Sequence, residues 1–395
     1  MAVDVASTFT WLAYSAGEQQ RAQELASLLS ERETRDELGL GSIRDAISDR
    51  LFPGTSTIQS RARYFLFLPW IFQQLEDGTG GRSQQNAERA ERKLGEQLRQ
   101  ADDRRGLVGN RSHLVLRLPS SIYWAGLGVL GIRRTQGPLS LYYRWLDDPQ
   151  RHRHHVRDDD HDTIAGTTTT WWDHVPSAPA GFPDGATFAL TLEEARYLAE
   201  RVVAATMYPT MLGRLWTSAT TTDDVEFPWD HPEASAMPSS VLEDLAVAEH
   251  FSLIAHGAQL LYNQLIATAR HDEEHVERYR VLVNEWQEQQ FEAVTTFDLE
   301  RVWRLTHSSK PRARDFVQQW QQLVRQSDSL LSTNITAQAF VRSREIRLKG
   351  EQHSRIANPF RVDWSGASGA SRMDFRWSVA VKQMCIDLTE GRARA

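Results

Sequence analysis

The sequence predicts a mainly α-helical protein, on three observations. In many segments apolar residues recur every three or four positions, which is the spacing of one helix face. Residues suited to helix caps stand directly before several of these segments, most clearly Thr191 with Glu194 three positions later, a capping box. Clusters of proline and glycine separate the segments, as turns between helices require.

The expected helices of the first part follow one another from the N-terminus. Ser42 is the expected cap of the second, and Pro69 is expected to kink or interrupt the third. The stretch 123–132 holds three glycines, which fits either a tightly packed helix or an irregular buried segment. The helices are expected at 18–32, at 43–51, from Thr55 or Ser56 toward Leu75, at 87–101 and at 139–146.

Beyond residue 188 the same patterns predict a second helical region. It holds a helix from the Thr191 cap to about Met207, a long helix at 240–269, and helices near 272–292, 311–326, 335–349 and 375–389. The segment before it is expected to be a long loop that contains His, Asp and Trp. We therefore expect three parts: a helical 1–146, the loop 147–188, and a C-terminal helical domain 189–395.

Composition excludes several classes of protein. The single cysteine, Cys385, rules out an intrachain disulfide and a zinc site built from several thiolates. The first ten residues lack the basic and apolar regions of a signal peptide, and the longest apolar stretch, 64–72, is too short to cross a membrane. We expect a cytoplasmic protein with no membrane partner. No phosphate-binding, dinucleotide-binding or hydrolase motif is present, so we find no catalytic motif and predict no cofactor.

Charge is distributed unevenly along the chain. The net charge is -7, yet 223–300 carries 17 acidic and 3 basic residues, whereas 301–361 carries 12 basic and 4 acidic residues. The basic block could hold the phosphates of a nucleic acid, with Arg312, Arg314, Arg344, Arg347 and Lys349 as the candidate residues. The alternative is that it docks on the acidic block or on a partner protein.

A second candidate for DNA binding is a helix-turn-helix-like unit at 42–76. If its later helix begins at Thr55 or Ser56, one stripe carries the polar side chains and the opposite face carries apolar ones. A recognition helix has this arrangement, and so does an ordinary packed helix pair. The candidate residues on the stripe are Ser56, Gln59, Ser60 and Arg63.

Acidic and histidine residues offer a metal-dependent alternative. Glu33, Asp36 and Asp45 are the residues that a metal-dependent nuclease would use, although salt bridges explain them equally. The run from His152 to His174 mixes imidazoles with carboxylates, but it falls in the expected loop, where a solvated segment is favoured. We therefore predict no metal site.

Four distinctive stretches stand out in the chain: TWLAYS, ETRDELGLGSIRDAISDRLFPGTSTIQSRARYFLFLPWIF, IYWAGLGVLGI and WSGASGASRMDFRW. Together they resemble an uncharacterised bacterial family known as a domain of unknown function, and they span most of the chain. The resemblance implies no catalytic residue, but it implies a link to phage-defence genes. The expected function is a non-catalytic component of an anti-phage defence or DNA-processing system that binds DNA or other protein subunits. The alternatives are a metal-dependent nuclease and a purely structural adaptor.

Overall fold

The computed structural model describes residues 36–394, apart from 79–80, 102, 104, 109–116, 149–170, 219, 221–224 and 307–309. These residues form α-helices α2 to α14 and no β-strand, which confirms the mainly α fold. None of the helices in these ranges is long and apolar enough to span a membrane.

The N-terminal helices agree with the sequence patterns at most positions. The stretch with three glycines is a helix, and the capping box before α7 is present with both of its hydrogen bonds. The 18–32 prediction lies outside the described residues. The elements are α2 (Gly41–Leu51), α3 (Tyr64–Glu76), α4 (Ser83–Gln100), α5 (Pro119–Val129), α6 (Leu139–Leu146), α7 (Leu192–Ala204) and α8 (Met211–Thr217).

The C-terminal helices lie near the predicted ranges, except that α11 was not predicted and that α14 begins at Lys382 instead of near residue 375. Short 3₁₀ turns η1 (Pro228–Asp230), η2 (Ala234–Ala236) and η3 (Glu351–His353) and a π-helical turn η4 (Trp377–Val381) connect them. The α-helices are α9 (Ser239–Ala269), α10 (Glu273–Thr296), α11 (Glu300–Leu305), α12 (Pro311–Gln326), α13 (Ile335–Lys349) and α14 (Lys382–Ala393).

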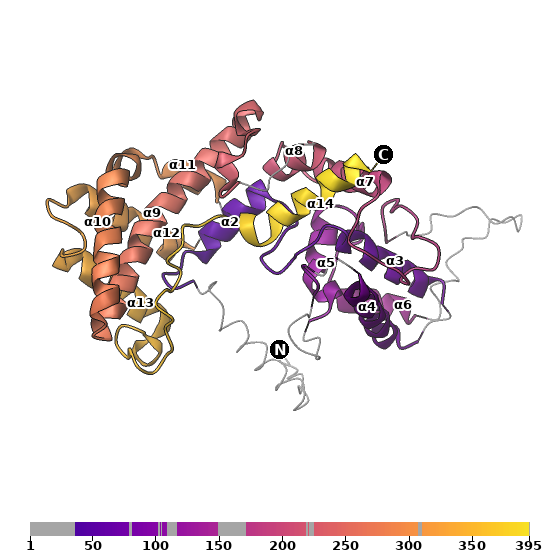
Figure 1. Ribbon diagram of the computed structural model, residues 1–395, viewed down its shortest axis with the longest axis horizontal. Coiled ribbons are helices and arrows are strands. Elements are labelled where there is room, and N and C mark those ends of the chain that lie inside the picture. Colours follow the sequence, from indigo (N-terminus) through magenta and orange to yellow (C-terminus); the bar gives the residue numbers. More distant parts are fainter. Residues whose placement is uncertain are drawn as a thin grey trace, which may run out of the picture.

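The molecule is elongated, with α3 to α6 toward one end and α9 to α13 toward the other (Figure 1). Helices α2 and α14 lie between the two ends. α2 packs on α9, and α14 packs on α7 and α8, although it follows α9 to α13 in the chain. The C-terminal helix therefore returns to the half of the molecule built from N-terminal residues.

Helices α9 and α10 form the centre of the C-terminal half. Gly257 lets them approach closely, because a Cβ at this position would lie 2.4 Å from the ring of Trp286. The indole N–H of Trp286 donates to the carbonyl of Leu253 at 3.0 Å, and that of Trp320 on α12 donates to Ile254, also at 3.0 Å. Two buried tryptophans thus fix α10 and α12 against α9.

The helix expected to begin at Thr55 or Ser56 begins instead at Tyr64, so this prediction is wrong. The hydroxyl of Tyr123 on α5 accepts hydrogen bonds from the backbone N–H groups of Ser60 and Arg61, at 2.8 and 3.1 Å. These tertiary bonds hold 55–63 as turns. Pro69 lies inside α3 without ending the helix, since α3 continues to Glu76.

Candidate functional site

The polar stripe predicted at 56–63 is not a surface stripe on a helix. The Gln59 side chain is buried; it accepts from the N–H of Ser56 and donates to the carbonyl of Gly54, at 3.1 and 3.2 Å. Arg63 is buried in an ion pair with Glu194 at 2.7 Å. These contacts stabilise the packing before α3 and leave two of the four side chains, Gln59 and Arg63, inside the protein.

The candidate residues of the basic block are brought together instead, because three of the five line one pocket. This arginine pocket lies between α12 and α13 and has a volume of about 440 Å³. Asp315 is the one acidic residue among its described lining residues, so the lining carries a formal charge of +2. The lining residues are Arg312, Asp315, Phe316, Gln319, Phe340, Arg344, Arg347 and Leu348.

Arg344 forms the inner wall of the arginine pocket. Its guanidinium donates to the carbonyls of Leu38, Arg312 and Gly39, at 2.8, 3.0 and 3.3 Å. It lies 4.9 Å from the centre of the Phe316 ring, and its residue is 7% exposed. Burial lowers the pKa of Arg344, and no carboxylate of the described residues forms an ion pair with it. The pocket thus contains a buried positive charge that is bonded to neutral carbonyls.

Arg312 and Arg347 form the outer wall. Both side chains are exposed, and neither forms an ion pair with any carboxylate in the part of the chain that the structure describes. Arg347 donates to the carbonyl of Ser343 at 3.2 Å, one turn earlier on α13. The two guanidinium groups therefore keep donors available to an anion from solvent.

An aromatic pair forms the floor of the arginine pocket. The rings of Phe316 and Phe340 are stacked, with centroids 5.1 Å apart and an angle of 1° between their planes. Phe316 is buried beneath Arg344, whereas Phe340 is partly exposed. The charge pattern of the sequence had located the arginines, but these phenylalanines resembled ordinary core positions and were not predicted.

Lys349 and Arg314 do not line the arginine pocket. Lys349 belongs to a buried charge cluster, where its ammonium donates to Tyr262 and Glu345, at 3.0 and 3.1 Å, and pairs with Glu37. Burial alone would raise the pKa of Glu37, but Lys349 and Arg355 hold that pKa below its usual value. The cluster ties the segment before α2 to α9 and α13, so it is a structural contact.

Arg314 points toward α11. It donates to the carbonyl of Trp303 at 3.1 Å, and its guanidinium carbon lies 5.1 Å from the centre of that indole ring. Arg314 therefore packs against a neighbouring helix and is partly exposed.

The acidic and basic blocks do not neutralise each other directly. None of the ion pairs within the described ranges joins an acid of 223–300 to a base of 301–361. Arg50, Arg280 and Arg372 are the arginines that pair with acids of the first block. The basic block therefore has capacity for an anionic ligand.

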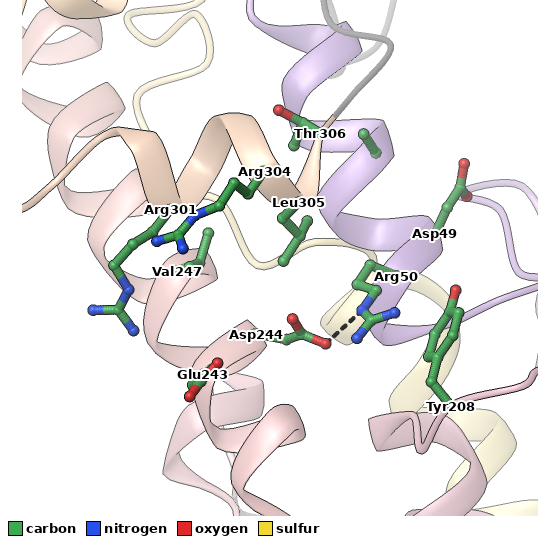
Figure 2. Close-up of a pocket in the computed structure, with 11 residues that line it drawn as sticks. Asp49, Arg50, Tyr208, Glu243, Asp244, Val247, Arg301, Arg304, Leu305 and Thr306 are labelled. Carbon is green, nitrogen blue, oxygen red and sulfur yellow. Dashed lines mark hydrogen bonds and ion pairs between the residues drawn. The ribbon is translucent and has the colours of Figure 1, made fainter.

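A larger groove of about 740 Å³ lies where α2, α9 and α11 meet (Figure 2). An ion pair between Arg50 and Asp244, 2.6 Å long, crosses it, and Arg50 stacks 3.6 Å from the centre of the Tyr208 ring. Arg301 and Arg304 complete its three arginines, but Asp49, Glu243 and Asp244 match them in number. The lining of this groove carries no net formal charge and its Arg50 is already paired with Asp244, whereas the lining of the arginine pocket carries +2.

The residues of the nuclease alternative have other partners or lie outside the described residues. Asp36 accepts the N–H groups of Leu40 and Gly41 at the start of α2, at 2.5 and 2.7 Å. Asp45 pairs with Arg44 at 3.0 Å. In the described ranges, no three or more His, Cys, Asp or Glu residues are grouped as metal ligands. Glu33 and the histidines from His152 to His161 lie outside these ranges, and His174 is exposed beside Asp173.

The fold and the pockets are those of a mainly α-helical protein. The chain is a member of a family described as "Family of unknown function (DUF6361)", whose model matches residues 6–390. This match confirms the resemblance seen in the sequence. No curated protein and no solved structure matches the chain.

Proposed function

We propose that this protein binds single-stranded nucleic acid in the arginine pocket, without catalysing a reaction on it. The observation that carries the proposal is the gathering of Arg312, Arg344 and Arg347 around one pocket with one carboxylate, Asp315. Guanidinium groups bind phosphates through paired, charge-assisted hydrogen bonds. The two exposed arginines supply these donors, while the buried third adds positive potential behind them.

The aromatic floor supports a single strand as the ligand. Proteins that bind single strands combine cationic side chains for the backbone with aromatic rings on which unpaired bases stack. Phe340 is a partly exposed ring in the same pocket as the two exposed arginines. A pocket of about 440 Å³ suits one unpaired nucleotide, whereas the bases of a duplex are already stacked on one another.

We also propose that the protein is an accessory component of a bacterial anti-phage defence or DNA-processing system, and that binding nucleic acid is its task there. This part rests on the resemblance of the four sequence stretches and on no contact in the structure. It implies protein partners in addition to nucleic acid.

The test is the affinity of the purified protein for a fluorescent oligothymidylate, measured by anisotropy. Arg347→Glu should weaken binding about 10-fold or more at low salt, because it removes a phosphate contact and adds a repelling charge. Arg342→Glu is the matched control, since Arg342 is exposed on the same helix but does not line the pocket. It should change the affinity less than about threefold.

Two results would contradict the proposal. Equal losses in both variants would mean that general surface charge, and not the arginine pocket, holds the strand. No binding by the unmodified protein would favour the structural adaptor. Incubation of the same DNA with Mn²⁺ tests the nuclease alternative, because cleavage that is lost in Asp36→Ala would support that alternative instead.

A further inference from the structure

A glycine-containing loop, residues 366–373, is fixed to α9 by its carbonyl groups. Ser252, His256 and Asn263 lie on one face of α9 and donate to the carbonyls of Met373, Ala370 and Ser368, at 2.8, 3.1 and 3.0 Å. Gln259 falls on the same face, since the four positions are spaced by four, three and four residues. Three of the four side chains on this face therefore hold the loop against α9.

The attachment of the carbonyls determines where the loop amides point. In a trans peptide the N–H of one residue points opposite to the carbonyl of the residue before it. Because the carbonyls of 368, 370 and 373 point at α9, the N–H groups of Gly369, Ser371 and Asp374 point away from it. None of these three N–H groups donates to an acceptor in the described part of the chain.

A cleft of about 630 Å³ lies along this loop, and α9 contributes one lining residue to it, Gln259. The loop lines it from Gly369 to Met373, and the segment before α2 lines it opposite. Arg372 reaches the cleft with a side chain that is 23% exposed, stacked 5.0 Å from the ring centres of both Phe227 and Trp229. The cleft therefore brings backbone donors and a guanidinium together.

Several polar atoms at this cleft make no hydrogen bond to the described residues. The Oε1 atom of Gln259 is buried without a hydrogen bond, and so are the Nε and Nη2 atoms of Arg372. The nearest carboxylate to Arg372 is that of Glu249, 3.7 Å from Nη2, which is longer than a hydrogen bond. Buried polar groups in folded proteins are nearly always paired, so such a set indicates a ligand.

Four acids and three arginines line the cleft, and three of the four acids are already engaged. Asp36 accepts the amides that begin α2, and Glu37 pairs with Lys349 and Arg355. Asp374 accepts the N–H groups of Arg376 and Ser378, at 3.2 and 2.8 Å. The remaining lining acid, Glu226, is exposed at the edge. The unpaired donors along the cleft are therefore the backbone N–H groups of Gly369 and Ser371, beside the Arg372 guanidinium, and donors select an anion.

We propose that this cleft binds the phosphate group of a small phosphorylated molecule. The amides of Gly369 and Ser371 and the guanidinium of Arg372 would hold the phosphate oxygens, as backbone concavities with a basic side chain do in other phosphate sites. The volume of the cleft is sufficient for a nucleotide. The site is separate from the arginine pocket and does not depend on the proposed binding of nucleic acid.

The test is the thermal stability of the full chain in the presence of inorganic phosphate or AMP, with adenosine as the comparison. A ligand at ten times its Kd should raise the Tm by about 2 °C. We expect this rise with phosphate and AMP but not with adenosine. A rise with AMP and none with phosphate would show that the base is also needed, and an equal rise with adenosine would overturn the proposal.

A pair of variants separates the loop amide from the side chain. Ser371→Pro removes the N–H group and should abolish the rise in Tm, whereas Ser371→Ala keeps that group and should preserve it. Arg372→Met removes the guanidinium but keeps an unbranched side chain of similar length, and it should also abolish the rise, which covers the case in which the proline variant does not fold. Arg312→Glu with Arg347→Glu should leave the rise intact. A rise that survives in Arg372→Met but disappears in the Arg312/Arg347 variant would assign phosphate to the arginine pocket and overturn this proposal.

Discussion

The arginines before α3 and the exposed arginines on α12 and α13 differ in burial and in the partner of the guanidinium group. Arg61 is buried and pairs with Asp387 at 2.9 Å, and Arg63 is buried and pairs with Glu194 at 2.7 Å. Arg312 and Arg347 are exposed, and within the described ranges they have no carboxylate partner. An arginine that is neutralised inside the protein stabilises the fold, whereas one without a carboxylate has charge to offer a ligand. The number of arginines in a segment of sequence does not tell which of them stabilise the fold and which can bind a ligand.

The largest expected effect comes from breaking the buried pair before α3. Asp387 on α14 accepts from Arg61 and from the N–H of Ala62, at 2.9 to 3.1 Å, and so connects the last helix to the turns before α3. Asp387→Ala should lower the free energy of unfolding by about 3–5 kcal/mol, because it leaves the Arg61 charge buried with Asp103 as its remaining acid. Denaturant unfolding measures this, and a loss below about 1 kcal/mol would contradict the structural role.

The next effect concerns Glu91, a buried acid that forms no ion pair with any base in the described part of the chain. Burial raises its pKa to about 7, against one hydrogen bond from the N–H of Ser120 at 2.8 Å, and its Oε1 atom is unpaired. The pKa is higher in the folded chain than in the unfolded chain, so the folded chain binds more protons between these two pKa values. Ionised Glu91 therefore destabilises the fold above about pH 7, and this cost disappears toward pH 5.

Glu91→Gln removes this dependence on pH. The variant should be more stable than the unmodified protein by about 2 kcal/mol at pH 8 and by much less at pH 5. Thermal unfolding at the two pH values measures the difference. An equal effect at both pH values would show that Glu91 does not titrate in this range.

A smaller effect is expected at the cap of α7. The Thr191 hydroxyl accepts the N–H of Glu194 at 3.2 Å, while the Glu194 carboxylate accepts the N–H of Thr191 at 3.0 Å and pairs with Arg63. Thr191→Ala should cost about 1 kcal/mol of stability. Thr191→Ser keeps the hydroxyl and should cost clearly less, so equal losses in both variants would mean that the cap contributes little.

The smallest effect on stability is expected at the arginine pocket. Arg347→Ser should change the free energy of unfolding by less than about 0.5 kcal/mol, since the side chain is exposed and makes one local hydrogen bond. Denaturant unfolding of this variant and of Asp387→Ala under the same conditions compares the two losses of stability directly. A loss of several kcal/mol would place Arg347 among the structural arginines.

Local sequence patterns predicted the ends of a helix well where hydrogen bonds between nearby residues determine those ends. Helices α6, α12 and α13 begin and end at the residues that periodicity indicated, and the Thr191 capping box is present. The start of α3 was wrong because it depends on Tyr123, whose hydroxyl binds the amides of Ser60 and Arg61 from 62 or more residues away. No local pattern carries that information.

For the same reason, the lining of the arginine pocket could be predicted only in part, and the binding of nucleic acid there stays a prediction. The basic block identified Arg312, Arg344 and Arg347, but it could not separate them from Lys349, which a distant acid, Glu37, draws into the buried charge cluster. Nor could it show that the amides of the 366–373 loop are unpaired, because that follows from contacts with α9. Residue type suggests a chemistry, and tertiary pairing decides which residues remain available for it.

The most direct test of the account is the salt dependence of oligothymidylate binding. For the unmodified protein the logarithm of the association constant should fall linearly with the logarithm of salt concentration, since phosphate contacts release counterions. Arg312→Glu with Arg347→Glu should reduce that slope by about 1.4, because two phosphate contacts of a single strand are lost, while Arg89→Glu on α4 should leave it unchanged. A slope that is the same in all three proteins would contradict the assignment of nucleic-acid binding to the arginine pocket.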